Sequence, residues 1–432
     1  MKRHILTVML CLLATSLTCR ADALDDIKAN PRLAGGNLVS YPYLYETPPA
    51  LSAPPQGYVP FHIEHYGRHG SRWLLKDRDY VKPLNVLKDA DRAGALTPLG
   101  KEVLLWVKKA EKEAQFHYGD LTEIGAQQHR GIARRMFANF PEIFSDSARI
   151  DAKSTVVIRC ILSMTNELVE LARLNPSLRI TQESSKINQW YLQNSDRDTV
   201  AHAVRRTADP MFNEFAQKHR DPAPLMKRLF NNPEYVKKHV DRHDLFAKLF
   251  ELASNQQSHG NDDSLYHIFT PEELYHQWVC NNAGWYLSSG NSPATLGRMP
   301  YTQRYLLANF IESADKAIAD GGNSASLRFG HESVILPMVC FMELNDYGQA
   351  IEDLDDVAGM WCNYRIFPMA SNIQLIFYRN HAKPDDILVK ALLNEEEVSL
   401  PVTPVTGKYY RWSELRKYYM EKIELFKVKF QA

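Results

Sequence analysis

Hydrophobic residues in the first half of the chain follow the spacing of alternating strands and helices. Residues 58–66 form a short apolar and aromatic run, which is typical of a β-strand. After Thr97-Pro98 and again after Thr122, apolar positions recur at helical spacing, and each threonine is typical of a helix N-cap. The β-branched run at 154–158 predicts a second strand. This order of elements predicts an α/β sandwich with a largely parallel sheet.

The pattern changes from residue 186 to residue 319. Strand-like runs are scarce there, and charged and aromatic residues mix at helical spacing, which predicts a helical insertion or cap. A β/α pattern returns afterwards, with strands predicted at 327–330, 372–378 and 387–393 and a terminal helix at 412–426.

The predicted fold is therefore a three-layer α/β sandwich with a mostly parallel central sheet and an inserted helical cap. Its core would comprise residues 24–185 and 320–432, and the cap residues 186–319. Residues 24–57 are rich in proline, glycine and tyrosine, so we interpret them as an extended N-terminal arm.

The first 23 residues are predicted to be a signal peptide. A basic start precedes an apolar run from Ile5 to Leu13, and Ala21-Asp22-Ala23 offers a cleavage site. The mature chain would then be exported, to a periplasm or to the exterior. A lipid anchor at Cys19 is disfavoured, because the three residues before it match a bacterial lipobox poorly. No later apolar run reaches the roughly 20 residues of a membrane span.

Composition narrows the classes of function. The 432 residues carry 51 basic and 51 acidic side chains, and this balance argues against a nucleic-acid-binding protein. The cysteines after the signal segment form no C-x-x-C pair, so a structural zinc or redox site is not indicated. Both disulfides and buried thiols remain open for these cysteines, which are Cys160, Cys280, Cys340 and Cys362.

Residues 68–72, Arg-His-Gly-Ser-Arg, directly follow the first predicted strand. Two arginines close to one histidine repel its protonated form, and buried guanidinium groups need an anion to balance them. Phosphate suits the bidentate geometry of arginine. The same charges would keep His69 neutral and able to attack phosphorus.

Two later clusters are expected at the same edge of the sheet. Arg159 would end the strand at 154–158, and Ser163 would cap the next helix. His331-Glu332 follows the strand at 327–330 at a junction with a helix. Ligands of α/β sheets gather at the carboxyl ends of strands, so these residues are predicted to meet His69 there.

Each residue also has a plain structural interpretation. Arg159 could be a salt-bridge partner, His331 a helix cap, and Glu332 a first-turn acid that the helix dipole favours. A metal site of His62, His65 and His69 is disfavoured, because residues 62 and 65 of a strand point to opposite faces. Ser71 has no base pattern nearby to make it a nucleophile.

Together these residues resemble the histidine phosphatase superfamily, in its acid phosphatase and phytase branch. That branch carries Arg-His-Gly-x-Arg-x-Pro near the N-terminus and His-Asp or His-Ala-Glu near the C-terminus. Residues 68–72 match the first motif, although Trp73-Leu74 departs from its ending. His331-Glu332 matches the second with glutamate for aspartate, and Ser333 stands where His-Ala-Glu has its glutamate. Residues 154–163 resemble the segment that supplies a third arginine.

The resemblance covers roughly residues 57–176 and 325–430 and implies a mechanism. His69 would form a covalent phosphohistidine, and Glu332 would protonate the leaving oxygen. The non-bridging oxygens would be bound by Arg68, Arg72, Arg159 and His331. No metal or other cofactor would be needed, since the arginines supply the positive charge.

The expected function is phosphomonoester hydrolysis in an exported protein. The resemblance makes inositol polyphosphates such as phytate the leading substrates. A broad acid phosphatase acting on sugar phosphates or nucleotides is the alternative enzyme. A phospho-ligand-binding protein without turnover is the alternative of another class. Oligomeric state does not follow from the sequence.

Overall fold

The computed structural model describes residues 22–44, 46–193, 199–260 and 265–430. Most of the predicted signal peptide, with Cys19, lies outside the described residues. Ala23, which that prediction includes, is the first residue of the first helix and is buried. In the described part of the chain, no helix is both long enough and apolar enough to cross a membrane.

The strands are β1 (Tyr58–Arg68), β2 (Arg149–Ser154), β3 (Arg179–Glu183), β4 (Ser324–Gly330), β5 (Asn372–Asn380), β6 (Lys383–Leu393), β7 (Glu396–Val398) and β8 (Tyr410–Arg411). The helices are α1 (Ala23–Ala29), α2 (Arg78–Arg92), α3 (Pro98–Ala114), α4 (Glu123–Asn139), α5 (Ile158–Leu174), α6 (Gln189–Leu192), α7 (Thr199–Arg206), α8 (Asp209–His219), α9 (Ala223–Leu229), α10 (Pro233–His239), α11 (Arg242–Asn255), α12 (Pro271–Ser289), α13 (Arg304–Asp320), α14 (Glu332–Met342), α15 (Leu354–Met360), α16 (Asn363–Ile366) and α17 (Trp412–Phe430).

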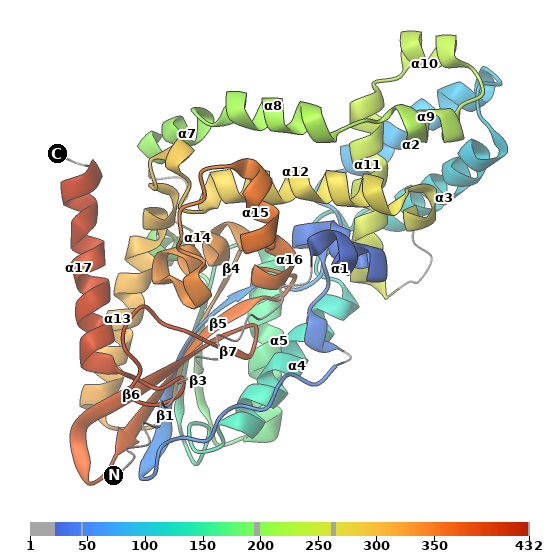
Figure 1. Cartoon of the computed structure of the whole chain (residues 1–432). Coiled ribbons are helices and arrows are strands. Elements are labelled where there is room, and N and C mark those ends of the chain that lie inside the picture. The colour runs from blue at the N-terminus through green and yellow to red at the C-terminus, as the bar shows by residue number, and fades with distance from the viewer. Residues whose placement is uncertain (1–21, 45, 194–198, 261–264, 431–432) are drawn as a thin grey trace, which may run out of the picture.

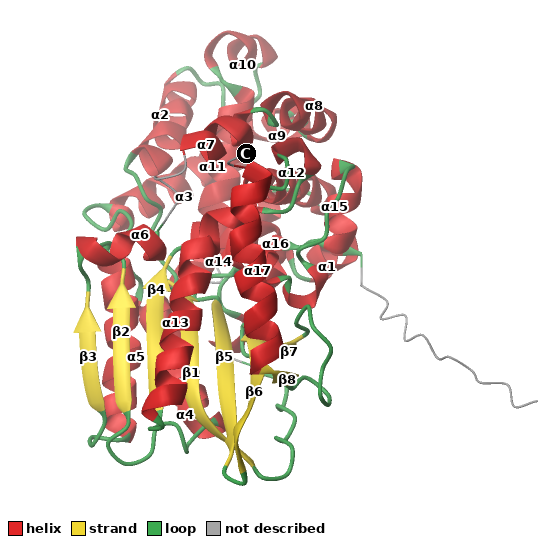
Figure 2. Ribbon diagram, turned by 90° about the vertical axis from the view of Figure 1, so that its left-hand side faces the viewer, coloured by secondary structure: helices red, strands yellow, loops and turns green. Residues whose placement is uncertain are grey.

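One sheet organises the molecule, in the order β3-β2-β4-β1-β5-β6-β7, with β8 paired to β6. The first four of these strands are parallel to one another. β5 and β6 form an antiparallel hairpin beside β1, as the paired strands of the sequence predicted. Helices α4 and α5 cover one face, and α13 and α17 cover the other (Figures 1 and 2). This arrangement confirms the three-layer α/β sandwich.

The remaining helices lie beyond the carboxyl ends of the parallel strands (Figure 1). Two features differ from the predicted division of the chain. Helices α2 and α3, assigned to the core, pack against α11 and α9 of the predicted cap. Helix α13, assigned to the cap, packs against β1 and α17. Its buried face carries apolar residues such as Leu306 and Phe310, which complete the core on that side of the sheet.

Two local predictions are wrong. The second strand spans Arg149–Ser154 rather than 154–158, because its charged side chains alternate with buried residues and hide the strand pattern. Residues 155–157 instead connect this strand to α5, so Arg159 lies in the first turn of a helix. Ser163 is in the interior of α5 and is not its N-cap.

The N-terminal arm is not extended throughout. It contains α1 and a 3-10 helix over Pro31–Leu38, and both pack against α12. The side chain of Asp22 caps α1 by accepting a hydrogen bond from the backbone of Leu24. The arm thereby brings the backbone of Asn37 to the end of β1.

None of Cys160, Cys280, Cys340 and Cys362 forms a disulfide, and all four are buried. Of the two states that the sequence left open, the structure therefore has buried thiols.

Candidate active site

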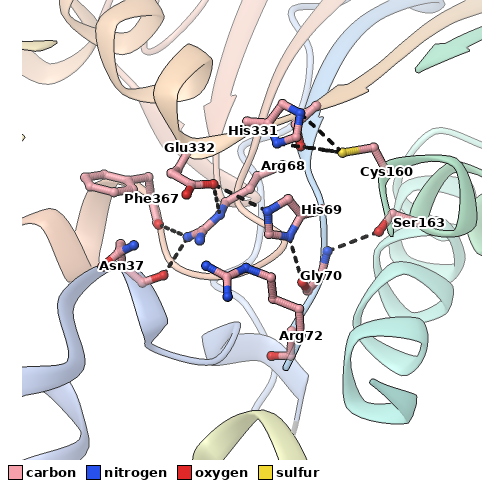
Figure 3. A network of polar contacts seen from close by, with 12 residues as sticks. Asn37, Arg68, His69, Gly70, Arg72, Cys160, Ser163, His331, Glu332 and Phe367 are labelled. Atoms are coloured by element: carbon pink, nitrogen blue, oxygen red, sulfur yellow. Dashed lines mark hydrogen bonds and ion pairs between the residues drawn. The ribbon is translucent and has the colours of Figure 1, made fainter. Parts of the chain in front are cut away.

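The site lies where β1 and β4 end side by side. These strands are parallel, and their last residues, Arg68 and Gly330, are paired in register. The next residues, His69 and His331, therefore meet, with their rings 5.7 Å apart, and the backbone N–H of His69 donates to the carbonyl of Gly330 at 2.9 Å. Glu332 follows as the first residue of α14 (Figure 3).

His69 is fully buried, and its proton is positioned by the backbone. Nδ1 lies 2.9 Å from the carbonyl oxygen of Gly70, which only accepts hydrogen bonds, so Nδ1 carries the hydrogen. Burial lowers the pKa of His69 well below its ordinary value; the contact with Glu332 opposes this shift, while the charges of Arg68 and Arg159 add to it. The ring is thus neutral, with a lone pair on Nε2.

Glu332 faces that lone pair. Its Oε2 atom lies 3.4 Å from Nε2 of His69 and 3.3 Å from Nε of Arg68. Burial alone would raise the pKa of Glu332, but the positive charges of Arg68 and Arg72 outweigh burial. The carboxyl pKa is held well below its usual range. Burial and the arginine charges act on this pKa in opposite directions, and the combined charge has the larger effect.

Three guanidinium groups surround the two side chains. Arg68 is fully buried, and its Nη1 donates to the carbonyls of Asn37 and Phe367 at 2.7 and 2.8 Å. Four buried nitrogens of these groups lack a hydrogen-bond acceptor, namely Nε and Nη2 of Arg68, Nε of Arg72 and Nε of Arg159, although Nε of Arg68 is ion-paired with Glu332. Buried donors without acceptors are costly, so this set is suited to an anion that accepts from them.

Arg159 reaches this cluster from the first turn of α5. Its charge contributes to lowering the pKa values of both His69 and His331, which places it within electrostatic reach of the two rings. A helix N-terminus adds a favourable field for an anion at this point. The sequence predicted Arg159 at the end of a strand, whereas the structure places it in a helix.

His331 is held by three neighbours. Its backbone N–H donates to the hydroxyl of Tyr66 at 3.2 Å, and its Nε2 lies 3.2 Å from the hydroxyl of Thr155. The thiol of Cys160 lies beside the same ring, at 3.8 Å from Nε2. Burial lowers the pKa of His331 to about 4, so the imidazole is neutral near pH 7.

The loop after β1 depends on close backbone approach. A Cβ atom on Gly70 would lie 2.5 Å from the carbonyl oxygen of Gly125, so only glycine fits. The N–H of Gly70 donates to the hydroxyl of Ser163 at 3.1 Å, and that of Ser71 to the side chain of Gln128 at 2.9 Å. Helices α5 and α4 therefore fix the loop. Neither these acceptor roles of Ser163 and Gln128 nor the carbonyls that bind Arg68 could be predicted from the sequence.

At residue 74, where the resembling motif has proline, this chain has leucine, and its backbone N–H is used. The N–H of Leu74 donates to the hydroxyl of Tyr80 at 3.0 Å, and a proline at residue 74 would lack that donor. Trp73 packs between the rings of His117 and His259.

The structure brings together all six residues that the sequence singled out. Three of them, His69, His331 and Glu332, place one potential metal ligand each within 4.8 Å of one another. The surrounding guanidinium groups would repel a cation and attract an anion. The set of His62, His65 and His69, which the sequence disfavoured as a metal site, does not form: His62 bonds to Glu64 and Ser324, on the face opposite His65.

Solved structures share this architecture. A multiple inositol polyphosphate phosphatase from Bifidobacterium longum, in complex with phosphate, gives a TM-score of 0.72 at 19% identity, covering 90% of this chain and 98% of its own. The phytase from D. castellii gives 0.70 at 13% identity, covering 91% and 85%. The chain has the histidine phosphatase fold. A phytase from Hafnia alvei gives 0.52 at 12% identity, covering 86% and 99%.

No family model matches the sequence, and no curated protein matches it. The likeness therefore lies in the fold, and the site must be argued from its own geometry.

Proposed function

We propose that this protein hydrolyses phosphomonoesters through a phosphohistidine on His69. The observation that carries the proposal is a buried, neutral imidazole whose free Nε2 faces a cluster of buried guanidinium N–H groups without acceptors. A phosphoryl group would satisfy those donors and present phosphorus to Nε2. This arrangement combines a nucleophile with charge stabilisation at the reacting centre.

In the first step Nε2 of His69 would form a bond to phosphorus while the bond to the leaving oxygen breaks. Glu332 would give its proton to that oxygen. In the second step water would attack phosphorus, the bond to Nε2 would break, and the carboxylate of Glu332 would accept a proton from the water. Arg68, Arg72, Arg159 and His331 would bind the non-bridging oxygens throughout.

Glu332 must gain a proton before it can act as an acid. In the ligand-free site the arginines hold its pKa low. An anionic phosphate among the same arginines would offset their charge and add its own repulsion, so the pKa of Glu332 would rise on binding. We infer that substrate binding itself prepares the proton donor.

Inositol polyphosphates are the proposed substrate class. One Bifidobacterium longum structure is a complex with inositol hexasulfate, and a Hafnia alvei phytase is also in complex with an inositol hexakis sulphate. Both share the fold, and the cluster of arginines suits a highly anionic substrate. Export by the N-terminal segment also remains a proposal.

The test measures phosphate release from phytate, glucose 1-phosphate and an aryl phosphate at pH 3–8 in the presence of EDTA. Release from phytate that persists in EDTA, with an acid-labile phosphoryl group trapped on wild type but not on His69→Ala, supports the proposal. Preference for glucose 1-phosphate would favour the broad phosphatase. No release from any ester would leave a phospho-ligand-binding protein. The exposed His381, replaced by alanine, serves as the control.

A further inference from the structure

Two histidines outside the proposed active site face each other, one on each of two packed helices. His219 is the last residue of α8, and His276 lies on α12, against which α8 packs. Their Nδ1 atoms are 3.0 Å apart. Both rings are half-buried. Nothing in the proposed phosphatase reaction uses this pair.

A carboxylate lies close to the first ring. Oδ1 of Asp355, at the start of α15, lies 3.5 Å from Nε2 of His219, and its other oxygen lies 3.2 Å from Nζ of Lys218. A carboxylate accepts hydrogen bonds, so it favours the tautomer with hydrogen on Nε2 and a lone pair on Nδ1 of His219. Carboxylate–histidine pairs of this kind typically support metal-binding histidines.

The second ring presents the same atom to the first, since the two Nδ1 atoms face each other. A neutral imidazole with its hydrogen on Nε2 presents a second lone pair from Nδ1. Two such lone pairs 3.0 Å apart repel each other unless a proton or a metal ion lies between them.

The distance between the two Nδ1 atoms matches that between two nitrogens bound to one metal ion. Zinc–nitrogen bonds of about 2.0–2.1 Å that meet at about 90–110° place the two nitrogens about 2.9–3.4 Å apart. A cavity of about 180 Å³ opens beside the two rings. Its wall includes Glu272, one helical turn before His276, and Gln277.

The charges around this cavity also favour a cation. Asp221, Glu272 and Glu273 contribute carboxylates to its wall, against Arg220 and the exposed His243. Glu273 is engaged by Arg228, whereas Glu272 is largely exposed and only loosely paired, 3.9 Å from Lys28. Glu272 lines the same cavity as the two rings, and a rotation of its side chain would have to bring its carboxylate to the ion.

We propose that His219 and His276 form a binding site for a divalent transition-metal ion such as Zn²⁺, completed by Glu272 and water. Imidazole and carboxylate are ligands that Zn²⁺ accepts. The bound ion would join the end of α8 to α12 and stabilise the helical layer above the sheet. This inference does not depend on the proposed phosphatase function.

The test titrates tag-free, chelator-treated protein with Zn²⁺ by calorimetry at pH 7.5 and records the visible absorption of the Co²⁺ form. We expect one site that survives in His331→Ala and is lost in the double variant His219→Gln/His276→Gln. Asp355→Asn should weaken the affinity by about tenfold. Circular dichroism checks that each variant folds, and His381→Gln is the matched control.

Unfolding temperature gives a second readout. Zn²⁺ should raise the unfolding temperature of the wild type and leave that of the double variant unchanged. If the double variant binds Zn²⁺ with unchanged affinity and stoichiometry, or if all binding disappears in His331→Ala, the proposal is overturned. The histidine pair would then be an imidazole–imidazole hydrogen bond that shares one proton.

Discussion

At His69 the position of one proton decides what the ring can do. The carbonyl of Gly70 holds the hydrogen on Nδ1, and burial keeps the second nitrogen unprotonated. A nucleophile is therefore available without a partner base. The sequence predicted the neutral ring from the arginines beside it, whereas in the structure burial is the larger cause.

Because burial keeps His69 neutral, we can predict how kcat/KM changes between pH 7 and pH 5. With an ordinary pKa of about 6.5 on His69, kcat/KM would fall about 25-fold between pH 7 and pH 5. Because the pKa is well below that value, and because Glu332 needs a proton, we expect kcat/KM to hold or rise over this interval. Steady-state kinetics on phytate at fixed ionic strength measures it. A fall with a midpoint near pH 6.5 would contradict the buried, neutral ring.

The role of Glu332 as a proton donor predicts a dependence on the leaving group. In Glu332→Gln the rate on an inositol phosphate, whose alkoxide leaves poorly without a proton, should drop by about 10²–10⁴. An aryl phosphate, whose leaving oxygen needs little help, should lose much less. Glu312→Gln, an exposed acid on α13, is the control. Equal losses on both esters would remove the proton-donor assignment.

Side chains of the proposed phosphate site could be singled out from the sequence, whereas the backbone groups that hold them could not. The segment 68–72 contains Arg68, His69 and Arg72, and this concentration of basic side chains can be recognised in the sequence. The carbonyls of Asn37 and Phe367, which bind Arg68, carry no sequence signal, because every residue has one. Only the folded chain brings residues 37, 68 and 367 together.

At the scale of elements, two threonine caps were predicted correctly, whereas the Ser163 cap and the limits of the second strand were not. Thr97 and Thr122 cap α3 and α4 as predicted, because a threonine hydroxyl accepts from the backbone two or three residues later. The β-branched run at 155–157 misled the prediction of β2, because a connection between strand and helix can use the same residues. The edge strand β3 escaped prediction, since its residues are mostly exposed.

The two capping threonines contact different parts of the molecule, so replacing each should distinguish an effect on stability from an effect on catalysis. Thr97 bonds to its own helix and to the backbone of Arg228. Thr122 also donates to the carbonyl of Ser71, at 3.1 Å, in the loop that carries the arginines. Replacing either by alanine should cost about 1 kcal/mol of stability. We expect only Thr122→Ala to lower kcat/KM as well.

Urea unfolding and steady-state kinetics on the same preparations measure both effects. The two variants act as controls for each other, because each loses a threonine cap of a long helix. Equal kcat/KM values would show that the cap of α4 does not position the loop that carries the arginines.

At the scale of the whole molecule, acid should act on stability and on catalysis in opposite directions. Burial lowers the pKa of His65 to about 3, and that of His259 and His331 to about 4. The unfolded chain binds protons on these rings below about pH 6.5, while the folded chain does not. The contribution of these neutral rings to the free energy of unfolding is therefore complete above pH 6.5 and is lost as the pH falls towards 4.

His65 allows this loss to be tested away from the phosphate site. Both of its ring nitrogens are buried without hydrogen-bond partners beside Phe329, so leucine should fit the same apolar surroundings. Between pH 7 and pH 5 the unfolded-state protonation of His65 costs about 2 kcal/mol. His65→Leu should reduce the loss of unfolding free energy over that interval by this amount.

Urea unfolding at pH 7 and at pH 5 measures the difference, and the exposed His381→Leu should leave it unchanged. The activity of His65→Leu at pH 7 should match the wild type, since the ring touches none of the reacting groups. Because acid favours the proton donor while it destabilises the fold, the lowest working pH should be set by unfolding rather than by chemistry. The variant should then keep its activity to a lower pH than the wild type, and an unchanged acid limit would show that the chemistry sets it instead.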